Sequence, residues 1–170
     1  DFDDIMIKGV ELLLNNKNLK GRYKHILIEE FQDTNYLQYM FITLLGEGSD
    51  LFVVGDEDQS IYGWRYADSN NINKIKKINS NFGIFKLEQN YRSTPQILDI
   101  AQKVINHSSN RTNKTLWTNN PGGNVVTVIK QKSETSYILN KINNYISQGY
   151  DYSDIAILVR MRWQTRGFEQ

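Results

Sequence analysis

An α/β fold with parallel strands is predicted, because short apolar runs alternate with segments whose apolar residues recur at helical spacing. Residues 26–28 and 51–54 are apolar at successive positions, which is typical of strands buried on both faces of a parallel sheet. Between them, residues 37–45 place apolar side chains at helical intervals, which indicates an amphipathic helix. A strand, a helix and a strand at this spacing predict a βαβ unit.

The same two patterns predict the remaining elements in order along the chain. A helix is expected at the start, because Asp1 and Asp3 favour the positive end of a helix. Another is expected after Thr94 and Pro95, because a hydroxyl residue before proline is typical of a helix start. Two more helices are predicted around residues 72–75 and over residues 134–147. Further strands are predicted at residues 84–87, 125–129 and 155–159.

The bulk composition is that of an ordinary globular protein and excludes several classes. The 170 residues hold 20 Lys and Arg against 19 Asp and Glu, so the net charge of +1 argues neither for nor against a nucleic-acid partner. There are no cysteines, which excludes disulfides and thiolate metal sites. No apolar run approaches the roughly 18 residues of a membrane span and no signal peptide opens the chain, so a soluble, cytoplasmic protein is expected.

Acidic residues follow both strands of the predicted βαβ unit. Glu29 and Glu30 come directly after the first strand, and Asp56 follows the second. Ligands of open parallel sheets bind beyond the carboxyl ends of the strands. A carboxylate there can hold Mg²⁺, usually through water, and a neighbouring one can orient or deprotonate an attacking water. The alternative is an acidic pair that caps the helix that follows.

A second group of functional side chains lies in the loop after the second strand. Gln59, Tyr62, Trp64 and Arg65 fall within one short stretch, and Gly63 between the aromatic residues leaves the backbone free to turn. Aromatic side chains beside an arginine suit base stacking and phosphate contact on a single nucleic-acid strand. The alternative is that Tyr62 and Trp64 are core side chains.

A third group, Tyr91 and Arg92, precedes the helix start at Thr94. The tyrosine ring can stack on a nucleobase while the guanidinium group reaches a phosphate. The alternative is a tyrosine that packs within the loop and an Arg92 that pairs with Glu88. The residue types alone leave both interpretations open.

Together the three groups form a known set of motifs. FQDTN at residues 31–35, GDEDQSIYGWR at residues 55–65 and QNYRSTP at residues 89–95 resemble, in this order and spacing, motifs II, III and IV of superfamily 1 DNA helicases of the UvrD/Rep/PcrA type. DFDDI, TLWTNN and IAILVRMRWQTR look like flanking segments of the same family, so the resemblance covers nearly the whole chain. It implies parts of two RecA-like parallel-sheet domains of the P-loop NTPase type. Residues 1–84 would be the back half of the first motor domain and residues 85–170 the front half of the second.

The resemblance implies roles in ATP hydrolysis for five residues. Glu30 matches the carboxylate that positions or activates water, and Glu29 stands where the family usually has the aspartate that serves Mg²⁺. Gln59 matches the residue that senses the γ-phosphate and couples it to DNA. Tyr91 matches the residue that stacks on adenine, and Arg92 matches the arginine finger of the second motor domain. ATP and Mg²⁺ are therefore the implied cofactors.

The resemblance also implies a DNA-binding surface and an activity. Tyr62, Trp64 and Arg65 match single-strand contacts, with Trp64 as the main stacking platform, and Arg160 aligns with a DNA-contacting segment. The implied protein is an ATP-dependent helicase or translocase that moves 3′ to 5′ on DNA in repair or replication, with single-stranded and duplex DNA as partners. Two alternatives stay open, namely a degenerate single-strand-binding module without ATPase activity and the motor part of a helicase-nuclease.

This sequence departs from the family pattern at several positions. Glu29 replaces aspartate, so the metal ligand is one methylene longer, and Tyr66 stands where glycine is usual. Arg162 and Trp163 fall where small or amide residues are common. The 170 residues contain no G-x-x-x-x-G-K-S/T phosphate loop and no late motifs. We therefore expect an internal fragment that does not hydrolyse ATP by itself.

Overall fold

The predicted βαβ unit is present and carries the strands of the fold. Strand β1 (His25–Ile28) pairs in parallel with β2 (Asp50–Val53), in a register that runs from His25 opposite Asp50 to Ile28 opposite Val53. Helix α2 (Tyr36–Leu45) makes the crossover and ends at Gly46, as its sequence predicts. The α/β class with a parallel sheet is therefore confirmed.

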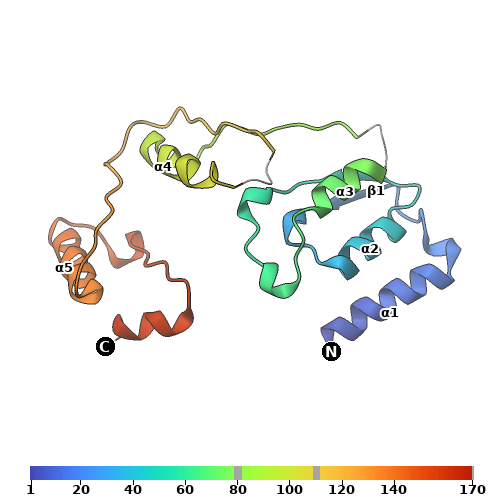
Figure 1. Cartoon of the computed structure of the whole chain (residues 1–170), viewed down its shortest axis with the longest axis horizontal. Coiled ribbons are helices and arrows are strands. Elements are labelled where there is room, and N and C mark those ends of the chain that lie inside the picture. Colours follow the sequence, from blue (N-terminus) through green and yellow to red (C-terminus); the bar gives the residue numbers. More distant parts are fainter. Residues whose placement is uncertain (79–81, 109–111, 170) are drawn as a thin grey trace. The chain divides into compact units, whose positions relative to one another are not determined.

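The helices that pack around this unit bury a small apolar core. Helix α1 (Phe2–Asn15) begins at a capping box formed by Asp1 and Asp4, and it packs against α2 (Figure 1). Helix α3 (Asn71–Ile78) follows the loop after β2. Among the described residues, the buried apolar side chains of these elements are Val10, Leu13, Phe31 and Ile75, and Leu98 is buried later in the chain.

The computed structural model describes residues 1–78, 82–108 and 112–169 (Figure 1). Two compact units are formed by residues 1–124 and residues 125–170. The first also contains α4 (Pro95–Ile105), and the second contains α5 (Glu134–Ser147), as predicted. None of the helices in the described ranges is long and apolar enough to cross a membrane. The short 3₁₀ helices are η1 (Lys17–Leu19), η2 (Phe31–Asp33), η3 (Glu57–Gln59), η4 (Gly63–Arg65), η5 (Tyr152–Asp154) and η6 (Arg162–Gly167).

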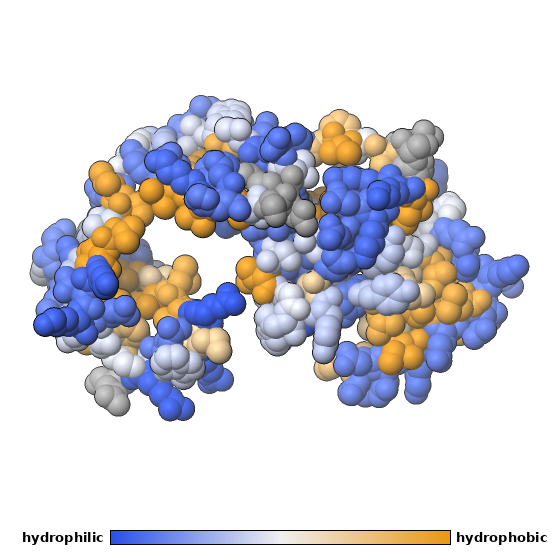
Figure 2. Space-filling model, viewed as in Figure 1, coloured by the Kyte–Doolittle hydropathy of each residue, from blue (hydrophilic) through white to orange (hydrophobic). Residues whose placement is uncertain are grey.

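The three later strand predictions, at residues 84–87, 125–129 and 155–159, are wrong for this structure. The described residues contain one sheet, of two strands, and apart from it an isolated bridge between Gln89 and Trp117. Val128 is 93% exposed and Leu158 is 95% exposed. An apolar run shows that a segment is suited to burial, but a strand also needs a neighbour to complete its hydrogen bonds. Apolar residues consequently remain at the surface (Figure 2).

The start of α4 is predicted correctly in position but not in its capping contact. Pro95 occupies the first turn and Thr94 is the capping residue, yet the Thr94 side chain makes no capping hydrogen bond. Its Oγ1 is buried without a partner among the described residues. The Thr94 side chain packs instead against Gly123, where an added Cβ would lie 2.7 Å from Thr94 Cγ2. Close packing against this backbone therefore replaces the expected cap.

Candidate functional site

The acidic pair lies at the carboxyl end of β1, and its backbone takes an unusual turn. Glu30 has φ 48° and ψ 41°, in the left-handed region that costs a non-glycine residue about 1–3 kcal/mol. The next residue, Phe31, is fully buried, and its N–H donates to Val54 O at 3.0 Å. Glu30 precedes η2 without a side-chain capping bond, so the alternative that the pair caps a helix is not supported. Both carboxylates are exposed.

Gln32 connects this acidic end of β1 to the loop after β2. Its Nε2 donates to Glu30 Oε2 at 2.7 Å, and its Oε1 accepts a hydrogen bond from the Asp56 backbone N–H at 3.0 Å. The residue is 1% exposed. The sequence motifs did not predict a role for Gln32. The signal available in the sequence was an amide two residues after Glu30, next to Phe31, whose apolar side chain is buried.

The loop after β2 turns at η3, where Asp56 and Gln59 contact each other. Asp56 Oδ1 accepts from the Asp58 N–H at 3.0 Å, and Gln59 Nε2 donates to Asp56 Oδ2 at 2.7 Å. Gln59 is itself exposed. Parallel pairing brings the ends of β1 and β2 to one edge, so Glu30 and Gln59 belong to one hydrogen-bonded network through Gln32 and Asp56. The structure thus joins two of the predicted site residues.

A lysine distant in sequence contacts this turn. Lys114 Nζ forms an ion pair with Asp56 and lies 3.3 Å from Asp58 Oδ2. Burial raises the pKa of Asp56, but the hydrogen bonds from Lys114, Gln59 and the Asp58 N–H, together with the positive charge of Lys114, lower this pKa below its ordinary value. Burial lowers the pKa of Lys114, but the hydrogen bond to Asp56 and the negative charges of Asp56, Asp58 and Glu57 together raise it above its ordinary value. Both members of the ion pair, the Asp56 carboxylate and the Lys114 ammonium group, are therefore held in their charged forms. The spacing of these residues in the sequence gave no indication of the pair.

The aromatic residues after the turn form an exposed cluster with a cation. The rings of Tyr62 and Trp64 are 6.3 Å apart between centroids and tilted by 50°. Arg65 Cζ lies 4.4 Å from the Trp64 ring centroid and 5.6 Å from that of Tyr62. Trp64 is 70% exposed, so the alternative that it is a core side chain is wrong. Tyr66, where the resemblance leads to an expected glycine, has φ 64° and is in the left-handed region.

The loop that carries Tyr91 and Arg92 is held by Asn90, whose Oδ1 accepts from the N–H groups of Arg92 at 2.9 Å and Ser93 at 2.7 Å. Tyr91 is 77% exposed, and its hydroxyl donates to Gln89 Oε1 at 2.9 Å. Arg92 forms no ion pair within the described residues. The expected alternative, a pair with Glu88, is therefore absent.

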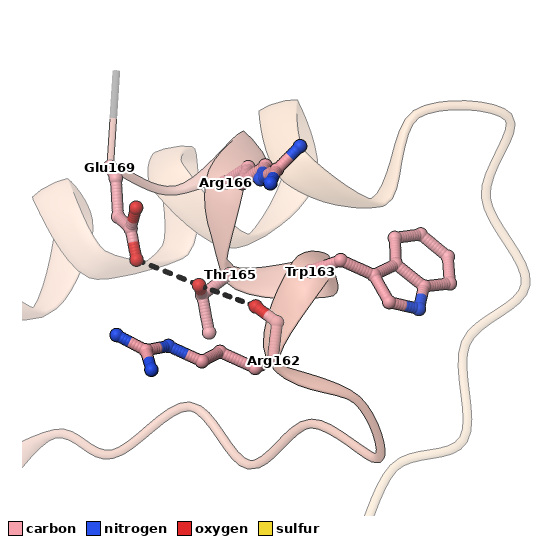
Figure 3. A pocket seen from close by; sticks show the side chains of 5 residues that line it. All are labelled: Arg162, Trp163, Thr165, Arg166 and Glu169. Atoms are coloured by element: carbon pink, nitrogen blue, oxygen red, sulfur yellow. Dashed lines mark hydrogen bonds between the residues drawn. The ribbon is translucent and has the colours of Figure 1, made fainter.

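In the second unit, Arg160 is exposed and lies two residues before Arg162 in the sequence. Arg162 lines a pocket (Figure 3). The pocket has a volume of about 430 Å³, and the Thr165 hydroxyl lies 2.8 Å from Arg162 O and 2.7 Å from Glu169 Oε1. Trp163 projects away from these contacts (Figure 3). The lining residues are Arg162, Trp163, Thr165, Arg166 and Glu169.

Glu29 has the chemistry expected of a partial Mg²⁺ site. Mg²⁺ is usually held by one or two carboxylates together with substrate phosphates and water. The Glu29 side chain is exposed and makes no hydrogen bond or ion pair with another described residue, so it fits this pattern. Over residues 1–78, 82–108 and 112–169, no group of three or more acidic or histidine side chains could hold a metal by protein ligands alone.

Two family models match the chain in tandem. The UvrD/REP helicase N-terminal domain matches residues 1–80, and the UvrD-like helicase C-terminal domain matches residues 85–170. Residues 1–80 include the acidic pair, the turn at η3 and the aromatic cluster, whereas residues 85–170 include Tyr91, Arg92 and Arg160. The two matches therefore account for both halves of the motif series.

Individual relatives match over the whole chain. A probable DNA helicase II homolog of Rickettsia conorii is 42% identical over 179 aligned positions, which cover 100% of this chain and 27% of that protein. The ATP-dependent DNA helicase PcrA of Leuconostoc citreum is 41% identical, with 100% and 24% coverage. The chain thus spans about a quarter of the length of these curated relatives. From the motifs, the family models and these relatives together, the chain belongs to the UvrD/REP helicase family.

Proposed function

We propose that these residues form part of an ATP-dependent DNA helicase that couples ATP hydrolysis to 3′ to 5′ movement on single-stranded DNA. The observation that carries the proposal is the hydrogen-bonded network from Glu30 through Gln32 and Asp56 to Gln59. It places a carboxylate suited to activating water in the same unit as an exposed amide suited to contacting a phosphate. We propose that this chain is part of a longer protein, which we call the full-length protein.

In this proposal the two halves of the chain belong to two RecA-like motor domains, with a boundary near Phe85. The division between the two family-model matches, at residues 80 and 85, supports this boundary. ATP would bind between the domains, where Tyr91 stacks on its base and Arg92 neutralises developing charge on the γ-phosphate. The exposure of Tyr91 and the absence of an ion pair at Arg92 within the described residues support these roles.

The residues of the first domain would then perform three tasks. Glu29 would serve Mg²⁺, which supplies charge neutralisation at the phosphates when bound. Glu30 would accept a hydrogen bond from the attacking water and orient it. Gln59 would contact the γ-phosphate, and the short connection from η3 to η4 would relay its position to Trp64 and the bound DNA strand.

The substitution Glu30→Gln in the full-length protein tests the proposal. It keeps the shape of the side chain but removes the charge that orients water, so ATP turnover should be lost while nucleotide binding stays largely intact. Glu47→Gln is a matched control, because Glu47 is an exposed carboxylate paired with Lys20 on the surface. The measurements are DNA-stimulated phosphate release and binding of a fluorescent ATP analogue. Turnover at the unsubstituted rate would show that the acidic pair is structural.

A second candidate is a module that binds single strands without hydrolysis. It is favoured by the exposed Tyr62, Trp64 and Arg65 cluster, which needs no nucleotide for stacking, and by the lack of a phosphate loop in these 170 residues. The gene sequence upstream separates the candidates, because a Gly-Lys-Thr loop in the same reading frame would establish an enzyme. Single-strand binding without DNA-stimulated ATPase activity in the full-length protein would establish the module.

A further inference from the structure

Gln32 occupies a buried position between the two loops that carry Glu30 and Gln59. Its side-chain amide contacts Glu30 on one side and the Asp56 N–H on the other, at 2.7 Å and 3.0 Å. Its backbone oxygen also accepts a hydrogen bond from the Ser60 hydroxyl at 3.3 Å. These three hydrogen bonds, and a longer one of 3.5 Å from Nε2 to Asp33 Oδ2, link a single 1% exposed residue to both loops.

The two partners of the Gln32 side chain require an amide. A backbone N–H can only donate, so the atom facing Asp56 must be the oxygen of the amide. An ionised carboxylate can only accept, so the atom facing Glu30 must be the NH₂ group. A glutamate at this position could not donate when ionised, and a methionine could neither donate nor accept strongly. The orientation of Gln32 is thus determined by the chemistry of its neighbours.

Two backbone features show that the site is built closely around this amide. An added Cβ at Gly55 would lie 2.9 Å from Gln32 Oε1 and 3.3 Å from the Gln32 backbone nitrogen, so a side chain at Gly55 would displace Gln32. Glu30 occupies the left-handed region, a strained conformation that persists only where surrounding contacts hold it. Gln32 supplies the side-chain contact to Glu30 in the described structure.

We propose that Gln32 is a positioning residue that fixes the Glu30 carboxylate relative to the turn at residues 56–59. The water-activating group and the phosphate-contacting Gln59 would then hold a constant geometry and respond together when nucleotide binds. The inference rests on the proposed function of Glu30 and Gln59, but the structural link it describes can be measured without catalysis. Gln32 itself contacts neither water nor phosphate in this proposal.

The first experiment separates catalysis from binding in the full-length protein. Gln32→Met removes the side-chain hydrogen bonds at similar volume. It should lower kcat by about 10–100-fold, as expected when a supporting contact is lost and a reacting group shifts by about 1 Å. The dissociation constant for a fluorescent ATP analogue should change little. Gln38→Met is the matched control, because Gln38 is an exposed glutamine whose Oε1 accepts from Asn35 within the capping box of α2. A kcat within twofold of the unsubstituted protein would overturn the proposal.

A second variant distinguishes positioning from general structural support. Gln32→Glu keeps the shape and the acceptor toward Asp56, but its ionised form repels Glu30 and cannot donate to it. The other charged groups near this position are Asp33, whose Oδ2 lies 3.5 Å from Gln32 Nε2, and the Asp56–Lys114 pair. Neighbouring carboxylates raise the pKa of the introduced group, so lower pH should protonate it and restore a donor. The kcat ratio of unsubstituted protein to variant should therefore fall between pH 8 and pH 6. A pH-independent ratio would assign Gln32 a structural role only.

A measurement on the 170-residue chain tests the link itself. With uniform ¹⁵N labelling, Glu30→Gln should shift the side-chain amide resonances of Gln32 and the backbone amide resonance of Asp56, whereas the control Glu47→Gln should leave them in place. Unchanged resonances would overturn the proposal whatever the ATPase rates show. A different result would refute the proposed function alone. In that case the Glu30→Gln variant of the full-length protein would hydrolyse ATP at the full rate, while the same substitution in the 170-residue chain would still shift the resonances. Shifted resonances together with the loss of kcat in both Gln32 variants would establish the positioning role.

Discussion

Trp64→Ala is the substitution that most directly tests the proposed DNA-binding surface. The Trp64 ring is 70% exposed, with Arg65 Cζ at 4.4 Å from its centroid. Stacking of one base on an aromatic side chain is typically worth about 1–3 kcal/mol. The substitution should therefore weaken single-strand binding by about 5–150-fold. In the full-length protein it should also uncouple ATP turnover from movement, because the relay that we propose from Gln59 would end at this ring.

The exposure of Trp64 also determines how much Trp64→Ala should lower the free energy of unfolding. A fully buried aromatic side chain removes about 150–250 Å² from water, so the covered third of Trp64 removes about 50–80 Å², which is worth about 1–2 kcal/mol. For a chain of this size, that loss lowers Tm by about 2–8 °C. A core tryptophan would instead cost about 3–5 kcal/mol. Tyr36→Ala is a suitable control, because Tyr36 is a 64% exposed aromatic residue on α2 and is not a member of the aromatic cluster.

Fluorescence anisotropy of a labelled oligonucleotide, repeated at several salt concentrations, measures the binding effect, and thermal melting of the same variant measures the stability effect. Stacking of an aromatic ring on a base releases no counterions, so Trp64→Ala should leave the salt dependence of DNA binding unchanged. Arg65→Ala should reduce the slope of the binding constant against salt concentration, both on logarithmic scales, by about one. A Trp64→Ala variant that binds DNA as tightly as the unsubstituted protein refutes the stacking assignment. A loss of Tm typical of a core residue would refute the exposed geometry.

Four further outcomes are expected. The 170-residue chain should show no DNA-stimulated ATP hydrolysis in a phosphate-release assay, because it lacks the backbone cradle and lysine of a phosphate loop, and clear turnover would contradict the proposed division of the site. Glu29→Asp in the full-length protein should leave kcat unchanged if the longer carboxylate already serves Mg²⁺. A kcat of the variant well below that of the unsubstituted protein, measured in a Mg²⁺ titration of activity, would show that the site has adapted to glutamate. Tyr66→Gly should stabilise the chain by up to about 1 kcal/mol in denaturant unfolding, because relief of left-handed strain outweighs the entropy cost of glycine, while Tyr66→Ala, which keeps the strain, should not. The pKa of Asp56 is lowered in the folded chain, so its contribution to stability is present above its unfolded pKa of about 3.9 and is lost as pH falls through the folded value. Asp56→Asn should therefore flatten the pH dependence of Tm in that acidic window. An unaltered profile of Tm against pH would exclude the ion pair with Lys114 as the cause of this dependence.

The elements that sequence analysis predicted correctly are those whose cause is local. Helix α2 follows from its apolar spacing and from Gly46 at its end, and α5 has the predicted bounds, because Ser133 caps a regular amphipathic stretch. The two strands of the βαβ unit also follow locally, since one crossover helix connects them. In contrast, the runs at residues 125–129 and 155–159 lack a paired neighbour in the described structure. Their pattern specified a tendency to be buried without specifying a partner.

For the candidate site, sequence analysis identified the groups that face solvent but not the groups that hold them. The motifs led to Glu30, Gln59 and Trp64, and all three are exposed. Gln32 and Lys114 were missed because their roles depend on contacts with residues 24 and 58 positions away in sequence. The left-handed conformation of Glu30 had no local signal either, since glutamate does not favour it. At Tyr66 there was a signal, because the resemblance leads to a glycine at this position, and glycine readily adopts the left-handed conformation.

The hydrogen bonds between the two strand ends also have a consequence for the time at which the site forms during synthesis. Phe31 N–H donates to Val54 O, and Gln32 Oε1 accepts from the Asp56 N–H, so neither bond can form until residues beyond β2 have been made. At about 5–20 residues per second, the ribosome needs about one to five seconds between adding Glu30 and adding Asp56. Helix formation takes on the order of a microsecond, so the formation of α2 does not set this delay. A nascent chain arrested between these residues would therefore carry an acidic loop without its partner strand end.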